Sequence, residues 1–306
     1  MPAIPLSRMC ADIRKGGRFL PRHRHTHEDP MAITVDLHNH TLHSHAKDTT
    51  EAMAASAFAK GMAIFGLSEH SLRPEGYMYP ADYQPRLEAG FPSYIEEVLA
   101  EREKYQGRME VLLALEMDYM PAETAYAAES VAQYPYEYII GGLHFLDHWG
   151  FDHSASDWDP LTDAQCCRHF ERYYEDLITM ADTGLFQLAA HPDLVKLFRK
   201  GAFDAWVTTP KAREVINAAL KAMRDNGMAM EISSAAIRKG LGEPYPGPVI
   251  MEMARDARVP ISFGSDAHAV ADVASNFEIL AAYAQRFGYS ESAVFRNRTM
   301  SLRPFV

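Results

Sequence analysis

Metal-ligating side chains follow six short apolar runs of this 306-residue chain. The runs ITVDL, MAIFGLSE, VLLAL, YIIGGL, FQLAA and ISFGS lead, in this order, into His38 and His40, His70, Glu116, His144, His191, and Asp266 and His268. Side chains two residues apart on a strand point the same way, so His38 and His40 can reach one ion. Because these residue types recur after six runs, we interpret them as one site rather than as isolated histidines.

Imidazole and carboxylate groups without thiolates suit zinc, manganese or iron. The set offers more ligands than one tetrahedral ion needs, and this indicates two or three divalent ions. Such ions polarise a substrate oxygen and lower the pKa of a bound water toward about 7, so the expected chemistry is hydrolysis. Glu116 is the natural bridge between two ions, because its two carboxylate oxygens can each bind one.

Short apolar runs alternate with segments of helical period from Met31 onward, and no Pro/Gly/Ser-rich linker divides them. The expected strands are 33–37, 62–67, 111–115, 138–143, 186–190, 228–232 and 259–263. The expected helices are 51–60, 94–105, 124–133, 163–183, 210–226, 248–258 and 276–287. This alternation is typical of α/β proteins with a parallel sheet.

Seven strand–helix units predict a closed barrel somewhat short of the usual eight. In such a barrel the carboxyl ends of the strands meet on one face, where the ligand types above would converge. The alternative is an open doubly wound sheet, but no Gly-rich phosphate fingerprint follows the first strand.

Composition excludes several classes of protein. The chain has 30 Lys and Arg against 41 Asp and Glu, a formal net charge of −11, which argues against broad nucleic-acid binding and against simple charge attraction of an anionic substrate. Its three cysteines, Cys10, Cys166 and Cys167, form neither a disulfide framework nor a CxxC zinc site, so a reducing, cytoplasmic setting is expected. No apolar run has the roughly 18 residues of a membrane helix.

The first 30 residues differ from the rest of the chain, because they hold six basic and three acidic residues. We interpret residues 1–30 as a flexible basic tail, Met31 as a candidate start of the native protein, and residues 31–306 as one barrel domain. The sequence does not indicate an oligomeric state.

The ordered segments DLHNHT, SEHS, LEMDY, GGLHF, AAHPDL and SFGSDAH resemble the PHP (polymerase and histidinol phosphatase) family, from about Ala32 to the end of the last expected helix. GGLHFLD, HPDLVKLF and EISSAAIRKGLGEPYP are similar to segments of its monofunctional histidinol-phosphate phosphatases. The resemblance implies a distorted (β/α)7 TIM-like barrel with a trinuclear metal site at the carboxyl ends of the strands. It also implies hydrolysis of L-histidinol phosphate, in histidine biosynthesis, by a hydroxide held between metal ions.

The resemblance further implies the ligands of each ion. These are His38, His40, Asp266 and Glu116 for the first, Glu116, His144 and His191 for the second, and His45, His70 and His268 for the third. In the family pattern the histidine of the first loop stands one residue further from His38 than His45 does. A one-residue deletion would leave His45 as the ligand, and His43 is the alternative. Among these residues we expect Glu116, Asp266 and His268 to be catalytic.

A phosphate ester must be received by local positive charge. Besides the ions, the expected side-chain cations are Arg238, after the sixth strand, and Lys196, after HPDL; both resemble basic positions of the phosphatases. Phe145, with Trp149, could form a wall for a planar ring. The proton for the departing alkoxide could come from a metal-bound water or from a histidine of the cluster.

The sequence leaves three alternative functions open. A PHP phosphoesterase could act on a nucleotide or another small phosphate. An amidohydrolase-like barrel could cleave a lactone or amide, but such enzymes usually place a lysine on a barrel strand, and none of the expected strand ends presents one. A metal-binding module without catalysis is the third.

Overall fold

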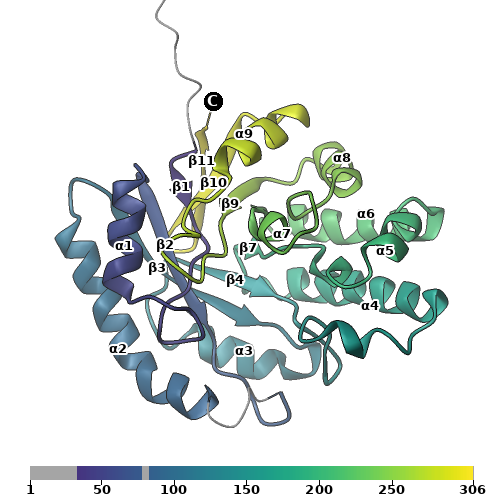
Figure 1. Cartoon of the computed structure of the whole chain (residues 1–306), viewed down its shortest axis with the longest axis horizontal. Helices are drawn as coiled ribbons and strands as arrows, with labels where there is room; N and C mark the ends of the chain where they lie inside the picture. Colours follow the sequence, from purple (N-terminus) through teal and green to yellow (C-terminus); the bar gives the residue numbers. More distant parts are fainter. Residues whose placement is uncertain (1–32, 78–82, 306) are drawn as a thin grey trace, which may run out of the picture. The chain divides into compact units, whose positions relative to one another are not determined.

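The computed structural model describes residues 33–77 and 83–305, so the predicted tail, residues 1–30, and the candidate start at Met31 lie outside the described residues. Seven parallel strands form one sheet in the order of the chain (Figure 1). They are β1 (Val35–Asp36), β2 (Ile64–His70), β3 (Glu110–Asp118), β4 (Tyr138–Gly142), β7 (Leu188–Ala189), β8 (Ala229–Ser233) and β9 (Ile261–Gly264). Each overlaps a predicted run, so the seven predicted strands are confirmed.

Backbone hydrogen bonds between the first and last strands nearly close the barrel. The Leu37 N–H donates to the Phe263 carbonyl at 3.0 Å. Beyond the strand ends, the His40 N–H donates to the Ala267 carbonyl at 2.9 Å. Because neighbouring strands follow the chain order without a switch point, the predicted barrel is confirmed and the open doubly wound sheet is excluded.

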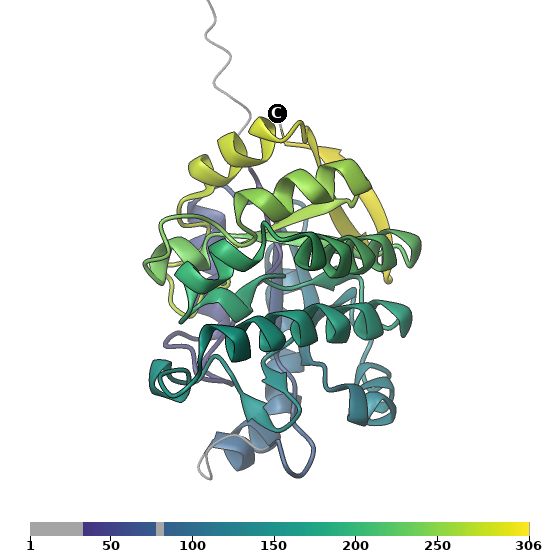
Figure 2. The same ribbon diagram turned by 90° about the vertical axis from the view of Figure 1, so that its right-hand side faces the viewer.

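Helices cover the outside of the barrel. Those that overlap predicted segments are α1 (Thr50–Ala59), α2 (Tyr83–Lys104), α3 (Thr124–Val131), α4 (Asp163–Asp182), α6 (Pro210–Asp225), α8 (Pro248–Ala257) and α9 (Phe277–Arg286). The Thr49 and Thr162 hydroxyls cap α1 and α4, and Pro210 and Pro248 occupy first-turn positions of α6 and α8, where proline is favoured. Figure 2 shows α4, α6 and α8 side by side on the outer surface.

Some elements differ from the prediction. Helix α2 begins at Tyr83, well before the expected residue 94, and it continues through Pro92. Helices α5 (Lys200–Trp206) and α7 (Ala235–Arg238) and the small hairpin of β5 (Phe145–Leu146) and β6 (Trp149–Gly150) were not predicted. Elements this short have too few residues to show a period in the sequence. None of the helices in the described part of the chain is long and apolar enough to span a membrane.

A second unpredicted hairpin closes the amino-terminal end of the barrel. Strands β10 (Glu291–Arg296) and β11 (Thr299–Pro304) pair antiparallel. Arg296 forms an ion pair with Glu110, the first residue of β3, and the Arg298 N–H donates to the Glu137 carbonyl, just before β4, at 2.7 Å. The hairpin therefore lies against the ends of the strands opposite to the predicted site.

The apolar core has two layers because side chains alternate along each strand. On β3, Leu113 and Leu115 pack against the helices, and Leu112 and Ala114 belong to the core inside the barrel. We call this inner core the lumen core; it consists of Val35, Leu37, Ile64, Leu112, Ala114, Tyr138, Ile140, Leu188, Ala190, Ala229, Ala293, Val294 and Phe295. The last three come from β10, so the hairpin completes the inner core. The lumen core fills the amino-terminal part of the barrel interior, and the predicted ligands follow at the carboxyl end.

Candidate metal centre

The Glu116 carboxylate, on the next inward position of β3 after Ala114, lies at the centre of a histidine cluster. Nitrogens of five histidines lie 3.0–3.7 Å from its two oxygens: His38, His40 and His70 near Oε2, and His144 and His191 near Oε1. Asp266 joins them, with Oδ1 3.4 Å from His40 Nε2 and 3.8 Å from His38 Nε2. The structure therefore brings together predicted ligands from six strand ends.

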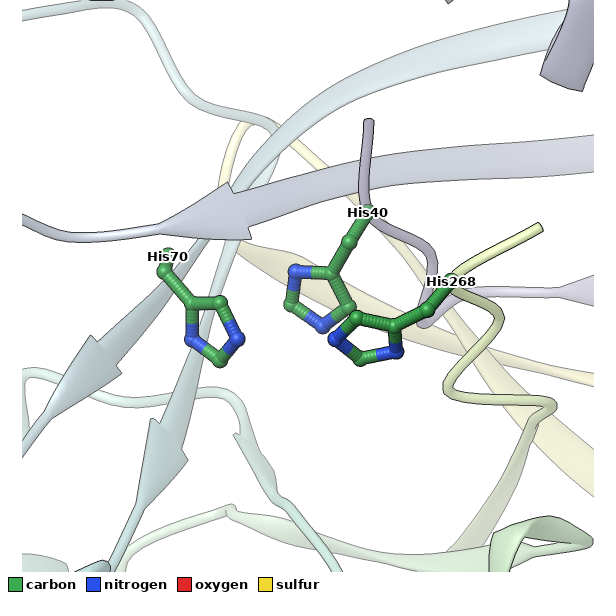
Figure 3. A group of neighbouring side chains, drawn as sticks. All are labelled: His40, His70 and His268. Carbon is green, nitrogen blue, oxygen red and sulfur yellow. The ribbon is translucent and has the colours of Figure 1, made fainter. Parts of the chain in front are cut away.

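Three groups of side chains within this cluster are compact enough to hold one ion each. In each group the potential ligand atoms lie within 4.8 Å of one another; the groups are His38, His40 and Glu116; Glu116, His144 and His191; and His40, His70 and His268. Figure 3 shows the third group, whose three rings gather from the ends of β1 and β2 and from the loop after β9. Glu116 is shared by two groups and His40 by two, so neighbouring groups have common donors.

The first loop places His45 and His43 in different surroundings. The His45 ring lies 4.3 Å from the His268 ring and 4.9 Å from the His70 ring, centre to centre. His43 points to Glu97 of α2, with Nε2 3.0 Å from its carboxylate. Of the two alternatives, His45 is thus the one that lies in the cluster.

Several potential metal-ligand atoms of the cluster have no hydrogen-bond partner among the described residues. Neither Glu116 oxygen accepts a hydrogen bond from the described residues, although this side chain is only 1% exposed. The Nε2 atom of His268 is likewise buried without a partner among those residues. Buried polar atoms are nearly always satisfied, so several unsatisfied atoms that converge on common points indicate that a bound ion belongs there.

Three further carboxylates, which we call the outer carboxylates, orient the histidines. Glu231 Oε1 lies 2.8 Å from His38 Nδ1, Glu69 Oε1 lies 3.3 Å from His40 Nδ1, and Asp118 accepts from His144 Nδ1; all three carboxylates are buried. Such contacts fix the ring orientation and leave the other nitrogen to face the centre, as in many metal sites. The sequence-based prediction missed these residues. Their signal was a carboxylate within an otherwise apolar strand.

Two glycines make room for this packing. A Cβ atom on Gly264 would lie 2.0 Å from Glu231 Oε1 and 2.7 Å from His38 Cβ. One on Gly142 would lie 2.9 Å from Glu116 Oε1 and 2.8 Å from the His144 ring. Any larger residue would displace the side chains of the cluster, so both strands need glycine where they pass it.

Two residues of the cluster have left-handed backbone conformations, with φ of +24° at His191 and +50° at Asp266. The His191 N–H donates to Glu231 Oε2 at 2.7 Å, and Arg238 donates to the Asp266 carbonyl at 2.8 Å. These contacts hold the two residues in a conformation that costs about 1–3 kcal/mol for most side chains. Strain of this kind concentrates at functional sites.

The protonation of the cluster follows its carboxylates. Burial disfavours the charged form of His40 and His144, yet hydrogen bonds and charge attraction from neighbouring carboxylates raise the pKa of each to about 9. Burial, reinforced by neighbouring imidazoles, lowers the pKa of His45 to about 2 and that of His268 to about 3. Burial opposes ionisation of Glu116, but the surrounding histidines hold its pKa well below the usual value. Glu116 is therefore ionised, and His45 and His268 are neutral, so that each of these three side chains can offer a lone pair to a cation.

A pocket opens onto the cluster. It is lined by His45, His70, Arg73, Glu116, His144, Asp152, His191, Leu194, Lys239, Asp266 and His268. Arg73 donates through Nε to Asp118, and its guanidinium carbon lies 4.8 Å from the centre of the Phe145 ring. Lys239 Nζ lies 3.7 Å from Asp266 Oδ2. The pocket thus combines two side-chain cations with the histidine cluster, and Phe145 supports one of them.

The two cations predicted from the sequence lie outside the lining of this pocket. Lys196 is fully buried, and its ammonium donates to Asp193 at 2.7 Å and to Glu243 at 2.8 Å. Arg238 holds the Asp266 carbonyl and donates to the Ser275 hydroxyl at 3.1 Å. Arg238 Nε also lies 3.5 Å from Asp272 Oδ1. Since the charges of Lys196 and Arg238 are already paired, we interpret both residues as fixing the loops that carry the cluster.

Comparison with known proteins gives a matching family and full-length relatives. Residues 36–235 match the model of the PHP domain family. A protein of Deinococcus radiodurans named "Probable histidinol-phosphatase" is 29% identical over 273 residues, covering 88% of this chain and 99% of that protein. The histidinol-phosphatase of Bacillus subtilis is 25% identical over 251 residues, covering 76% and 92% of the two chains.

A solved structure shares the fold. The histidinol phosphate phosphatase of Lactococcus lactis, complexed with zinc, L-histidinol and phosphate, superposes with a TM-score of 0.69 at 15% sequence identity. The match covers 88% of this chain and 98% of that protein. At this level of identity the superposition supports the seven-stranded barrel.

Proposed function

The chain belongs to the PHP family, and from this premise we propose that it is a metal-dependent phosphomonoesterase that hydrolyses L-histidinol phosphate. The observation that carries the proposal is the buried Glu116 carboxylate, whose two oxygens lie 3.0–3.7 Å from nitrogens of five histidines. The names of the full-length relatives supply the substrate. Histidine biosynthesis is the corresponding process.

We assign the cluster to two or three divalent ions, zinc, manganese or iron. The first ion would be held by His38, His40, Glu116 and Asp266, the second by Glu116, His144 and His191, and the third by His45, His70 and His268. The ligand atoms of His40 also lie within 4.8 Å of those of His70 and His268, so His40 lies between the sites of the first and third ions. Ions bound here would supply the positive charge that neutralises a phosphoryl group and activates water.

The side chains of the pocket would bind and orient the ester. Arg73, fixed by Asp118 and by the Phe145 ring, and Lys239, beside Asp266, are the cations placed to receive phosphoryl oxygens. An Arg guanidinium held in one orientation loses little freedom when it binds, which favours it as a phosphate ligand. Although the chain has a net negative charge, Arg73 and Lys239 provide positive charge at the pocket where the substrate would bind.

The test is phosphate release from L-histidinol phosphate, nucleoside monophosphates and an aryl phosphate, with metal analysis of the same preparation. We expect L-histidinol phosphate to have the highest kcat/KM and the active protein to hold two to three ions. A nucleotide preference would move the proposal to the alternative substrate within the family. No release from any phosphate would refute it, and fewer than two ions in active protein would refute the multinuclear site.

A further inference from the structure

Asp152 occupies a fixed position at the pocket that none of the roles above uses. It follows the β5–β6 hairpin, next to the buried Phe151. The Phe151 N–H donates to the His144 carbonyl at 3.2 Å, and the Trp158 indole donates to the Phe151 carbonyl at 2.7 Å. Both peptide groups of Phe151 are therefore held, so the backbone that carries Asp152 is anchored beside a residue of the cluster.

The Asp152 carboxylate has no ion-pair partner in the part of the chain that the structure describes. It is half-buried and lines the pocket, as do the carboxylates of Glu116 and Asp266, which lie among histidines. Within residues 33–77 and 83–305, Asp152 takes part in no side-chain hydrogen bond and no ion pair. The pocket is thus lined by a carboxylate that forms no ion pair and no side-chain hydrogen bond with the described residues.

Such a charge is unfavourable for a plain phosphate ester. It repels the phosphoryl group that Arg73 and Lys239 attract, and partial burial strengthens the repulsion. A substrate that also carries a cationic group can be attracted to Asp152 through that group. A carboxylate without an ion-pair partner of its own among the described residues can therefore discriminate between phosphates: it repels esters that carry only negative charge and attracts esters that also carry an ammonium group.

We propose that Asp152 binds the ammonium group of the substrate and makes the pocket selective for phosphate esters of amino alcohols. The inference rests on the proposed function and deepens it. L-Histidinol phosphate has a primary ammonium on the carbon next to the ester methylene, so one small pocket can receive both of its charges. Asp152 acts here as a specificity determinant and takes no part in breaking the P–O bond.

A pair of substrates that differ only in the amine tests this role. We compare L-histidinol phosphate with its deamino analogue, imidazolylpropyl phosphate, in the wild type and in Asp152→Asn. The wild type should favour the amine-bearing ester by about 10- to 100-fold in kcat/KM, the range expected for a hydrogen-bonded charge pair. In Asp152→Asn this preference should be lost, through a higher KM for L-histidinol phosphate and an equal or lower KM for the analogue.

Asp159→Asn is the matched control, because it removes the same charge at an exposed position of the same segment outside the pocket. It should keep the wild-type preference, and Asp152→Glu should restore part of it. Equal losses for both substrates in Asp152→Asn would indicate a structural role and overturn the inference, as would a preference that survives the substitution. A wild type that hydrolyses both esters alike refutes only this inference, whereas one that hydrolyses neither refutes the proposed function.

Discussion

The two ends of the barrel interior are built by the same strands and have opposite chemistry. On β3, Leu112 and Ala114 belong to the lumen core, and two residues later Glu116 lies among the histidines. On β8, Ala229 belongs to the lumen core, and Glu231 contacts His38. On both strands the inward-facing residue changes from apolar to charged within two positions, so the apolar layer and the charged layer are directly adjacent.

This division separates stability from chemistry. The apolar end buries hydrophobic side chains beneath the β10–β11 hairpin, which favours folding. The charged end holds buried carboxylates, left-handed backbone and unsatisfied polar atoms, each of which opposes folding. A bound ion would compensate the carboxylates and the unsatisfied atoms. We therefore expect substitutions at the carboxyl end to change activity and metal content, and those at the amino end to change the free energy of unfolding.

The largest effect is expected for Glu116→Gln. The amide cannot bridge two ions, so kcat/KM should fall by about 1000-fold, beyond the 10- to 100-fold typical of residues that only orient a ligand. The melting temperature of the metal-free protein should change little, since the substitution is isosteric. Steady-state kinetics, metal analysis and thermal unfolding measure the three quantities.

Glu110→Gln is its control, because the same change is made on the same strand at the other end, where Glu110 pairs with Arg296 at the surface. It should leave kcat/KM and metal content at wild-type values. Full activity in Glu116→Gln would overturn the bridging assignment and, with it, the functional difference between the two ends.

At the apolar end, Phe295→Ala should destabilise the protein without affecting the chemistry. Phe295 is fully buried in the lumen core and its ring lies 5.5 Å from that of Tyr138. Removing a buried aromatic ring costs about 3–5 kcal/mol of unfolding free energy. Denaturant unfolding measures this loss, and kcat/KM below the transition should stay near the wild-type value.

The control for the hairpin is Leu302→Ala, since Leu302 on β11 is 50% exposed. Its effect should be within about 0.5 kcal/mol, as for most surface positions. If Phe295→Ala instead lowered metal content in the folded protein, the two ends would be coupled and the proposed separation would fail.

Glu231 stands at the boundary between the two layers. In Glu231→Gln one interaction, either with His38 Nδ1 or with the His191 N–H, becomes unfavourable, since the amide nitrogen cannot accept a hydrogen bond. Metal affinity should fall by about 10- to 100-fold. Competition with a chelator measures it, and Glu214→Gln on the exposed face of α6 serves as control. An unchanged affinity would show that the orientation of His38 does not depend on this carboxylate.

The strands and the cluster at their ends could be predicted because both depend on local order along the chain. Each strand is a short apolar run, and the next residues that are not apolar, such as His70 or His191, must emerge at the carboxyl end. Because the strands are parallel, these residues lie at the same end of the barrel regardless of the lengths and sequences of the loops. This is why a list of run ends sufficed to identify the residues that the structure brings together.

The outer carboxylates, the closing hairpin and the pocket cations depend on contacts between distant residues. Glu231 and His38 are 193 residues apart, and only the closed barrel brings them together. The hairpin contributes three residues to the lumen core, and charged residues flank them in β10. So short an apolar run between charged residues does not indicate a strand in the sequence. Whether Lys239 or Arg238 turns into the pocket is decided by the geometry after β8, which the order of two adjacent cations does not reveal.

The smallest expected effect concerns Tyr138, the polar group within the lumen core. Its hydroxyl donates to the Leu37 carbonyl, just before His38, in a space left by Gly66. Tyr138→Phe removes this bond and leaves a buried carbonyl with one partner fewer, which should cost about 1 kcal/mol of unfolding free energy. Denaturant unfolding measures the cost, and Tyr105→Phe, at a buried tyrosine of the outer layer, is the control. Because Leu37 directly precedes the cluster, a tenfold loss of metal affinity in Tyr138→Phe would show that the apolar layer positions the ligands; an unchanged affinity would confine its role to stability.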